Sequence, residues 1–312
     1  MRFLIVFPFL ALLPFPALSF PVEVRSCDRV LEFEEAPNAA VSNDINITEM
    51  MLALGLEEFM VGYTDIQEDS DVLPELRPQL SNLKELSNER ANTEVLLAAG
   101  ADFYFAGWNY GLTVGTEMSP EGLGRFGIAV YELTESCIHV ASKDQASIED
   151  MFSDLLNLGR IFGVEARAEK LVEEYRGKLE LLRQGKVTGG NPIRAFVYDS
   201  GEDAPFTAGR YAMPTALIQA AGGENVFADF ERSWATVGWE SVIERNPEIV
   251  VIVDYGAVTA EQKWTFMKEN PAFSEIAAVR QDRHVVLNYV EATPGPQNIG
   301  AIEKLANAFR SQ

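Results

Sequence analysis

The sequence is poor in the residues that bind structural metal ions and form covalent cross-links. Its 312 residues include two cysteines and two histidines, too few for a zinc ribbon or an iron–sulfur framework. Basic residues are also scarce, with 25 Lys and Arg against 47 Asp and Glu and a formal net charge of −22. Because so acidic a surface repels phosphate backbones and anionic lipid headgroups, the composition argues against nucleic-acid binding.

The motifs of common catalytic sites are missing as well. The chain has no Gly-x-Ser-x-Gly, no phosphate-binding glycine loop and no His-Glu-x-x-His. His139 and His284 alone do not indicate a bare transition-metal site, which usually needs two or more imidazoles or thiolates. We therefore expect no enzymatic activity. An exported hydrolase that uses a pair of the abundant carboxylates and an exported adhesion or scaffolding protein stay open as alternatives.

Only the N-terminus carries a long apolar run. Met1 and Arg2 precede an almost wholly apolar segment, residues 3–13, and small residues follow at positions 17 and 19. This pattern predicts a secretory signal peptide over residues 1–19, cleaved after Ser19. A transmembrane anchor is the alternative, but the run is shorter than the ~20 residues that span a bilayer, and prolines interrupt it.

Cys27 lies close to the new N-terminus that this cleavage would create. Arg25 stands near it in place of the small apolar residues that lipidation requires, so we expect no lipid anchor. Cys27 and Cys137 are then the only possible disulfide pair in an oxidising compartment. Two buried free thiols are the alternative.

Short apolar runs alternate with helical patterns, which predicts an α/β fold with mainly parallel sheets. In the first half, we expect strands at residues 60–63, 103–106 and 128–133 and helices at 47–54, with Asn46 as N-cap, and at 93–99. In the second half, we expect strands at 195–198, 249–253 and 285–289 and helices at 214–221, 239–245, 260–268 and 300–310.

A change of pattern separates the two halves. Residues 147–182 have apolar side chains at helical spacing, which predicts one long helix or two nearly collinear helices with a break near Gly163. A weak repeat relates residues 48–55 to 215–222 and residues 94–103 to 240–249. We expect an N-terminal lobe at 20–145, an interlobe helix at 146–184 and a C-terminal lobe at 185–312.

Candidate ligand-binding residues follow the expected strands, because ligands of open α/β sheets bind beyond the carboxyl ends of the strands. They combine aromatic rings with a few polar groups, which suits a bulky, partly flat organic ligand. Two of them are arginines that could hold an anionic group, or form ordinary surface ion pairs. The candidates are Asn43, Asp44, Asn46, Tyr63, Asp65, Trp108, Tyr110, Asp199, Arg210, Tyr211, Arg232, Trp234, Tyr255, Tyr289 and Glu291.

Four segments in this order resemble a known family. Residues 40–55 (AVSNDINITEMMLALG), 92–103 (NTEVLLAAGADF), 220–229 (AAGGENVFAD) and 239–252 (WESVIERNPEIVVI) are similar to the periplasmic binding proteins of iron–siderophore, haem and cobalamin ABC transporters. The resemblance implies two Rossmann-like α/β lobes joined by a single long α-helix, with the ligand in the cleft between them. It also implies a monomer in the periplasm that hands its ligand to an ABC permease.

The resemblance further assigns permease docking to Glu94 and Glu240, one on each lobe, although each glutamate could instead only complement the N-terminus of its helix. It implies no covalently bound cofactor and a ferric siderophore or another metal chelate as cargo. Arg210 and Arg232 would favour an anionic siderophore. Cobalamin and haem are the alternatives, and a tyrosine such as Tyr63, Tyr110 or Tyr255 would then bind haem iron. The chain departs from the family after its first strand, where residues 43–46 replace the usual prolines or serines.

Overall fold

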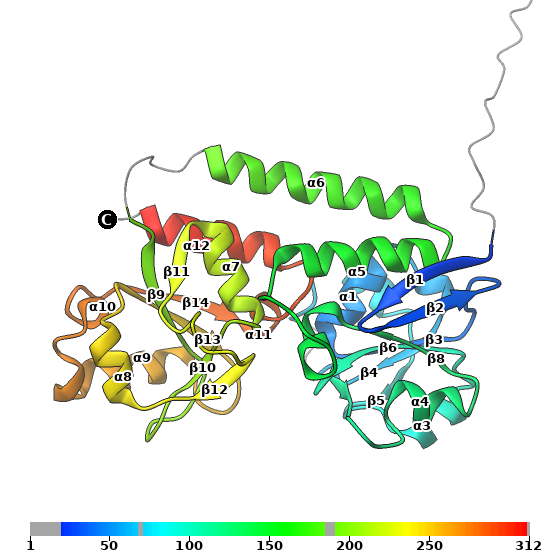
Figure 1. Ribbon diagram of the computed structural model, residues 1–312, viewed down its shortest axis with the longest axis horizontal. Helices are drawn as coiled ribbons and strands as arrows, with labels where there is room; N and C mark the ends of the chain where they lie inside the picture. The colour runs from blue at the N-terminus through cyan, green and yellow to red at the C-terminus, as the bar shows by residue number, and fades with distance from the viewer. Residues whose placement is uncertain (1–19, 68–70, 185–190, 311–312) are drawn as a thin grey trace, which may run out of the picture.

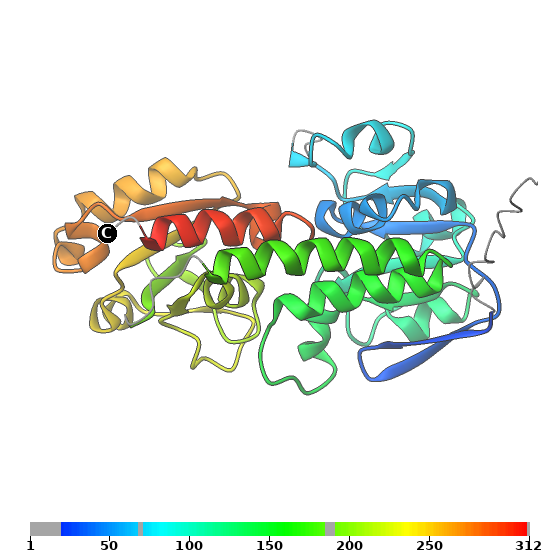
Figure 2. The ribbon, with the colours of Figure 1, turned by 90° about the horizontal axis from the view of Figure 1, so that it is seen from above.

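The computed structural model describes residues 20–67, 71–184 and 191–310. Two α/β lobes lie side by side, and a long helix, α6 (Glu165–Gln184), runs along one face from the first lobe to the second (Figures 1 and 2). The signal peptide predicted at residues 1–19 lies outside the described residues. Within the ranges described, no helix is both long and apolar enough to cross a membrane.

The first lobe is built on a parallel sheet with strand order β5-β4-β3-β6, to which β8 adds on the far side of β6 and β7 pairs with the end of β6. All six residues of β6 are buried, as expected for a parallel strand covered on both faces. Its strands are β3 (Ala40–Asn43), β4 (Met60–Thr64), β5 (Glu85–Ser87), β6 (Phe103–Trp108), β7 (Gly111–Leu112) and β8 (Ala129–Glu132). Its helices are α1 (Ile45–Ala53), η1 (Glu57–Phe59), α2 (Arg77–Leu80), α3 (Thr93–Ala98), α4 (Pro120–Gly124), η3 (Thr134–His139) and α5 (Ile148–Ile161).

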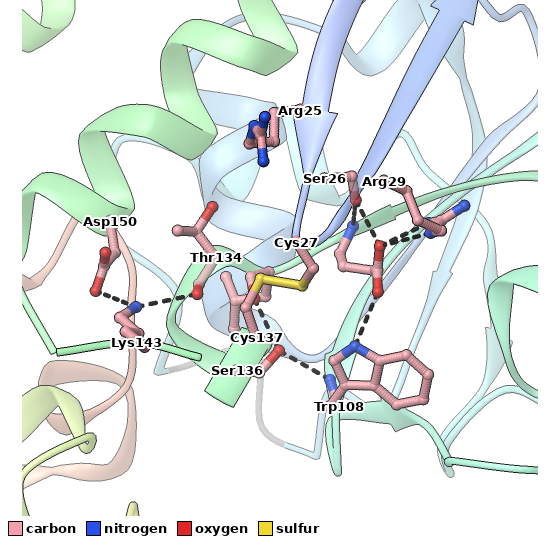
Figure 3. Close-up of a disulfide and its surroundings, with 12 residues drawn as sticks. Arg25, Ser26, Cys27, Arg29, Trp108, Thr134, Ser136, Cys137, Lys143 and Asp150 are labelled. Carbon is pink, nitrogen blue, oxygen red and sulfur yellow. Dashed lines mark hydrogen bonds and ion pairs between the residues drawn. A yellow bond between two sulfur atoms is a disulfide. The ribbon is translucent and has the colours of Figure 1, made fainter. Parts of the chain in front are cut away.

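An antiparallel hairpin of β1 (Val22–Ser26) and β2 (Arg29–Phe33) precedes this sheet, and the sequence patterns did not predict it. A disulfide joins Cys27, in the hairpin turn, to Cys137 of η3, which is the one pairing that the sequence allows (Figure 3). Beside it, the Ser136 hydroxyl accepts a hydrogen bond from the backbone amide of Trp108 at 2.9 Å. The disulfide therefore fixes the hairpin to the segment that supports the end of β6.

The second lobe contains a four-stranded parallel sheet with order β11-β9-β13-β14, and a short antiparallel pair, β10 and β12. Its strands are β9 (Ile193–Tyr198), β10 (Phe206–Ala208), β11 (Gly223–Asn225), β12 (Trp234–Thr236), β13 (Ile249–Asp254) and β14 (His284–Asn288). Its helices are α7 (Met213–Ala221), α8 (Trp239–Arg245), α9 (Ala260–Glu269), η4 (Pro271–Phe273), α10 (Ala277–Arg280), α11 (Tyr289–Ala292) and α12 (Asn298–Arg310).

The predicted repeat corresponds to equivalent positions in the two lobes. The Asp102 carboxylate accepts hydrogen bonds from the amides of Asn38 and Ala39, just before β3. The Glu248 carboxylate accepts one from the amide of Arg194 at the start of β9. In each lobe, an acidic residue before one strand thus binds the beginning of the neighbouring strand. This shared feature supports a structural repeat between the two sheets.

The fold class predicted from the sequence, two α/β lobes joined by a single long helix, is confirmed, but the prediction for residues 147–182 is wrong. Helices α5 and α6 are not collinear; they form a hairpin and lie side by side (Figures 1 and 2). Gly163 has a φ of +70°, a left-handed conformation that allows the reversal. Gly159 allows the two helices to approach closely, because a Cβ there would lie 2.5 Å from the Cβ of Ala168. Helix α6 thus connects the lobes, while α5 packs mainly on the first lobe and also contacts α7 of the second.

Candidate functional site

A cleft with a volume of about 670 Å³ lies between the two lobes. Both lobes contribute to its walls. The first lobe provides Asp44, Ile45, Asp65, Gln67, Asp71 and Arg90, and the second provides Asp254, Tyr255, Gly256, Asn288 and Tyr289. The volume is in the range of pockets that bind drug-sized organic molecules.

The parallel sheets explain why these residues meet. Asp44 directly follows β3 and Asp65 directly follows β4, while Asp254 ends β13 and Asn288 ends β14. Since the carboxyl ends of parallel strands lie at one edge of a sheet, each lobe presents a row of polar side chains to the other. The cleft is therefore a direct product of the α/β topology.

Asp44 is the most buried acidic residue of the cleft lining, with 4% of its surface exposed. It is the N-cap of α1, which corrects the prediction of Asn46, and its φ is +75°. One carboxylate oxygen accepts a hydrogen bond from the amide of Ile45 at 2.7 Å, and the other accepts one from the Tyr289 hydroxyl at 2.6 Å. Burial raises the pKa of Asp44 to about 6, although both hydrogen bonds oppose the shift. The bond to Tyr289 joins the two lobes across the cleft.

Asp65 and Arg90 form the ion pair of the cleft, with 3.5 Å between the Arg90 Nε and an Asp65 oxygen. The φ of Asp65 is +61°, a left-handed conformation that aspartate and asparagine tolerate better than most residues. Burial raises the pKa of Asp65, and the positive charge of Arg90 opposes the rise. Arg90 is the only basic residue among the described residues that line this cleft.

Two tyrosines form the aromatic part of the second wall. The rings of Tyr255 and Tyr289 stack with their centroids 4.8 Å apart and their planes inclined by 27°. Tyr255 is 55% exposed, so it still has apolar surface for a ligand to cover. Burial, and next the negative charge of Asp44, raise the pKa of Tyr289 well above its ordinary value, so its hydroxyl stays protonated and donates to Asp44.

The described residues of the lining offer carboxylates, amides and aromatic faces, and none of them carries a thiol or an imidazole. Across the ranges that the structure describes, no three His, Cys, Asp or Glu side chains are grouped so that they could hold a metal ion. These donors suit an organic ligand, or a metal that is already enclosed by an organic chelator, better than a bare cation.

Four predicted ligand-binding residues line the cleft: Asp44, Asp65, Tyr255 and Tyr289. The other first-lobe candidates have structural partners outside it. Asn43 holds strand ends together, since its side chain bonds Thr64, the amide of Ala91 and the carbonyl of Tyr110. The side chain of Asn46 donates to the carbonyl of Pro294 in the second lobe. Tyr63 is buried in the core, Trp108 is buried and donates to Glu132, and Tyr110 packs against the core.

The remaining second-lobe candidates also lie outside the cleft. Arg210 pairs with Glu231 and donates to the carbonyl of Ala228, while Arg232 is exposed. Asp199 accepts a hydrogen bond from Ser200, and Trp234 stacks on Phe206. The amide of Tyr211 bonds the carbonyl of Arg232, and Glu291 caps α11 and pairs with Lys304. The cleft therefore does not hold the two arginines that suggested an anionic ligand.

Sequence reasoning missed several residues of the lining. Asp254 and Asn288 occupy strand ends, so the rule that found Tyr255 could have found them. Arg90 follows β5, a three-residue strand that was not predicted because it is too short to show a pattern. Asp71 lies in a loop, and no local signal in the sequence identifies it.

Glu94 and Glu240 lie on exposed surface in the first turns of α3 and α8. These helices belong to different lobes, and both lie on the side of the molecule away from α6 (Figure 1). The first turn of one helix from each lobe thus lies on this side of the molecule, and each carries an exposed glutamate. Their predicted role in permease docking stays a prediction.

Two α/β lobes, one connecting helix and a cleft lined from both sides define a two-lobed solute-binding protein. A family model described as periplasmic binding protein matches residues 41–289. A vitamin B12-binding protein of Yersinia pestis is 25% identical over 218 residues, which are 70% of each chain. A periplasmic binding protein from Veillonella parvula has 29% identity and a TM-score of 0.81, over 93% of this chain and 98% of that one. An ABC-type Fe3+-hydroxamate transport system from Saccharomonospora viridis has a TM-score of 0.78 and 21% identity, over 94% and 100% of the two chains.

The chain belongs to the periplasmic binding protein family, whose model matches most of its length. Proteins of this family bind solutes for ABC transporters.

Proposed function

We propose that this protein is the periplasmic substrate-binding component of an ABC importer and that its cargo is a ferric siderophore. The cleft between the lobes is the observation that carries the proposal, because it can enclose an organic chelate from two sides. The similarity in fold to the Fe3+-hydroxamate transport protein agrees with an iron chelate. In this function the protein performs no chemistry and works as a monomer with no covalently bound cofactor.

Capture follows from the walls of the cleft. Tyr255 covers an apolar face of the chelate, and the strand-end groups Asp44, Asp65 and Asn288 bond polar atoms at its periphery. The iron keeps the ligands of its chelator, so the protein needs no metal-binding side chains of its own. Delivery then uses Glu94 and Glu240, which contact basic residues of the permease, one from each lobe.

Cobalamin is the second candidate cargo. The relative from Yersinia pestis is named a vitamin B12-binding protein, and the stacked rings of Tyr255 and Tyr289 provide a face for a corrin. Haem has less support, because the described lining of the cleft has no histidine and, of its two tyrosines, Tyr255 alone is exposed.

Isothermal titration calorimetry of the chain from residue 20 onward tests the function. The probes are a ferric trihydroxamate, haem and cobalamin, and we expect one of the chelates to bind at one site per chain. Tyr255→Ala should weaken that binding about tenfold, because a stacking face is lost. Val258→Ala is the matched control, since Val258 is an exposed apolar residue of the same loop outside the lining. Absence of binding to all three probes would refute the proposal, and turnover of a substrate panel would favour a hydrolase.

A second experiment tests docking and location. Reversing both charges, Glu94→Lys with Glu240→Lys, should abolish uptake by cells that carry the permease while leaving chelate affinity unchanged. Uptake at the normal rate would exclude docking through these residues. N-terminal sequencing of protein from the periplasm should begin at residue 20, and recovery of the uncleaved chain in the cytoplasm would contradict the predicted export.

A further inference from the structure

We infer that the cleft selects a chelate with a positively charged group at the end that the first lobe binds. The inference rests on the proposed function and adds the charge class of the cargo. It reverses the expectation of an anionic siderophore, which depended on Arg210 and Arg232. It is carried by the arrangement of charges around the cleft and by the open aromatic face opposite them.

The lining is strongly negative. Among the described residues, Asp44, Asp65, Asp71 and Asp254 line it together with a single cation, Arg90, so their negative charges exceed the positive by three when all four carboxylates are ionised. Arg90 already lies 3.5 Å from Asp65. An anionic chelate would therefore meet one cation that already has a partner, together with four carboxylates.

Among the carboxylates of the cleft, Asp44 should be stabilised most by a positively charged partner. Its carboxylate is buried and its hydrogen-bond donors, the amide of Ile45 and the hydroxyl of Tyr289, are both neutral. A carboxylate in such surroundings gains more from a nearby cation than one in water, because the effective dielectric constant is low. The negative charge of Asp65 raises the pKa of Asp44 more than the positive charge of Arg90 lowers it, so a cationic group of the cargo would supply positive charge that Asp44 lacks.

The aromatic wall fits the same group. Tyr289, which donates to Asp44, stacks on Tyr255, and the exposed ring of Tyr255 faces the cleft. Aromatic faces attract ammonium and guanidinium groups as well as apolar surface. A cation between Asp44 and the Tyr255 ring would thus be stabilised from both lobes at once.

A matched series of probes tests the inference. The first probe is the ferric complex of a linear trihydroxamate with a free terminal amine, which carries one positive charge. Acetylation of the amine makes the complex neutral, and succinylation gives it one negative charge, while the iron centre stays the same. We expect calorimetric affinity to fall about tenfold at each step at low salt, and the differences to shrink in high salt. For a corrin cargo, the cationic aquo form of cobalamin should bind more tightly than the neutral cyano form.

Variants connect the preference to the cleft. Asp65→Asn keeps a residue that tolerates the left-handed backbone and leaves Arg90 without its partner, so the preference for the cationic probe should fall about tenfold. Arg90→Gln should increase the preference. Asp144→Asn is the control, because Asp144 is an exposed aspartate outside the lining, and the preference should not change.

The outcomes separate this inference from the proposed function. Binding of all three probes with equal affinity, or tighter binding of the anionic probe, would overturn the charge preference and leave the carrier function intact. If Asp65→Asn and Asp144→Asn reduce the preference for the cationic probe equally, the preference arises outside the cleft. That result would also overturn the inference. No binding of any trihydroxamate or cobalamin would refute both.

Discussion

The two lobes share a topology but differ in what they bury. Five acidic side chains of the first lobe have a pKa raised by burial: about 6 for Asp44, about 7 for Glu49 and Asp154, about 8 for Glu135, and above its ordinary value for Asp65. In the second lobe, burial raises the pKa of Asp199, while hydrogen bonds from Arg245 and Lys268 lower those of Asp229 and Asp282.

The means of stabilisation differ in the same way. The first lobe has the disulfide and a buried carboxylate, Glu132, that accepts hydrogen bonds from Ser26, Arg29 and Trp108. The second lobe has no cysteine and builds one of its cores from aromatic rings around Trp239, which contacts Phe196, Tyr198, Phe266 and Phe273. The comparison teaches that the lobe with more buried acidic side chains is also the lobe with the covalent cross-link.

Loss of the disulfide should produce the largest difference between the lobes. The bond joins residues separated by 110 positions, and closing a loop of this length is worth about 5 kcal/mol in the chain-entropy description. We expect the double variant Cys27→Ser and Cys137→Ser to lose about that much stability in the first lobe. Hydrogen exchange measured on peptides from each lobe checks it. Equal loss of protection in both lobes would show that they unfold as one unit.

Trp239→Ala should instead destabilise the second lobe more than the first. Trp239 is buried among aromatic rings, and its indole donates to the carbonyl of Glu202 at 2.6 Å. Truncation of a large core aromatic residue costs about 3 to 5 kcal/mol, so peptides of the second lobe should lose protection first. Phe206→Ala is the control, because Phe206 is exposed and its loss should cost much less. Similar losses from both substitutions would contradict an aromatic core that stabilises this lobe.

Glu132→Gln should destabilise the first lobe by about 2 kcal/mol, because it leaves Arg29 without its ionic partner and disturbs a buried network. Arg29 is 27% exposed, so solvent screens part of the cost. Urea denaturation of this variant and of Glu121→Gln, an exposed glutamate of the same lobe, measures the difference. Matched midpoints would mean that the network contributes nothing to stability.

A further difference between the lobes is a gradual pH dependence of the first lobe. Between the ordinary pKa of a carboxyl and its raised folded-state pKa, the folded lobe keeps a proton that the unfolded chain has released. Stability should therefore fall as the pH rises from about 4 to about 8, the upper limit set by Glu135, and then level off. Glu135→Gln should flatten the upper part of this slope. A first-lobe stability that rises with pH over this range would contradict the burial of these acids.

Much of the fold was predictable because parallel strands and amphipathic helices leave strong local patterns. Helix α8 has the bounds that the sequence predicts, and β13 differs by one residue. The α5–α6 hairpin was not predictable, because apolar periodicity resumes after Gly163 whether the chain continues or turns back. The β1–β2 hairpin was missed since its strands are only five residues long and each buries few side chains.

The site was predictable where it depends on topology and not where it depends on loops. Asp44, Asp65, Tyr255 and Tyr289 follow strand ends, so the general rule for α/β sheets places them at the cleft. Arg210 and Arg232 were expected there because cations are rare in this chain, but rarity carries no information on position. Their actual neighbours, Glu231 and the carbonyl of Phe230, lie in a loop whose path the sequence does not reveal.

The disulfide has a topological consequence for the first lobe. Every strand of the first-lobe sheet, from β3 to β8, lies between Cys27 and Cys137, so the bond closes a covalent ring around the whole sheet. A protease that cuts one loop inside this ring opens it but separates no fragment, and the cut chain keeps its full mass until it is reduced. The first lobe, which holds most of the acidic groups of the cleft, can thus be cut once inside the ring and still remain covalently attached to the rest of the chain.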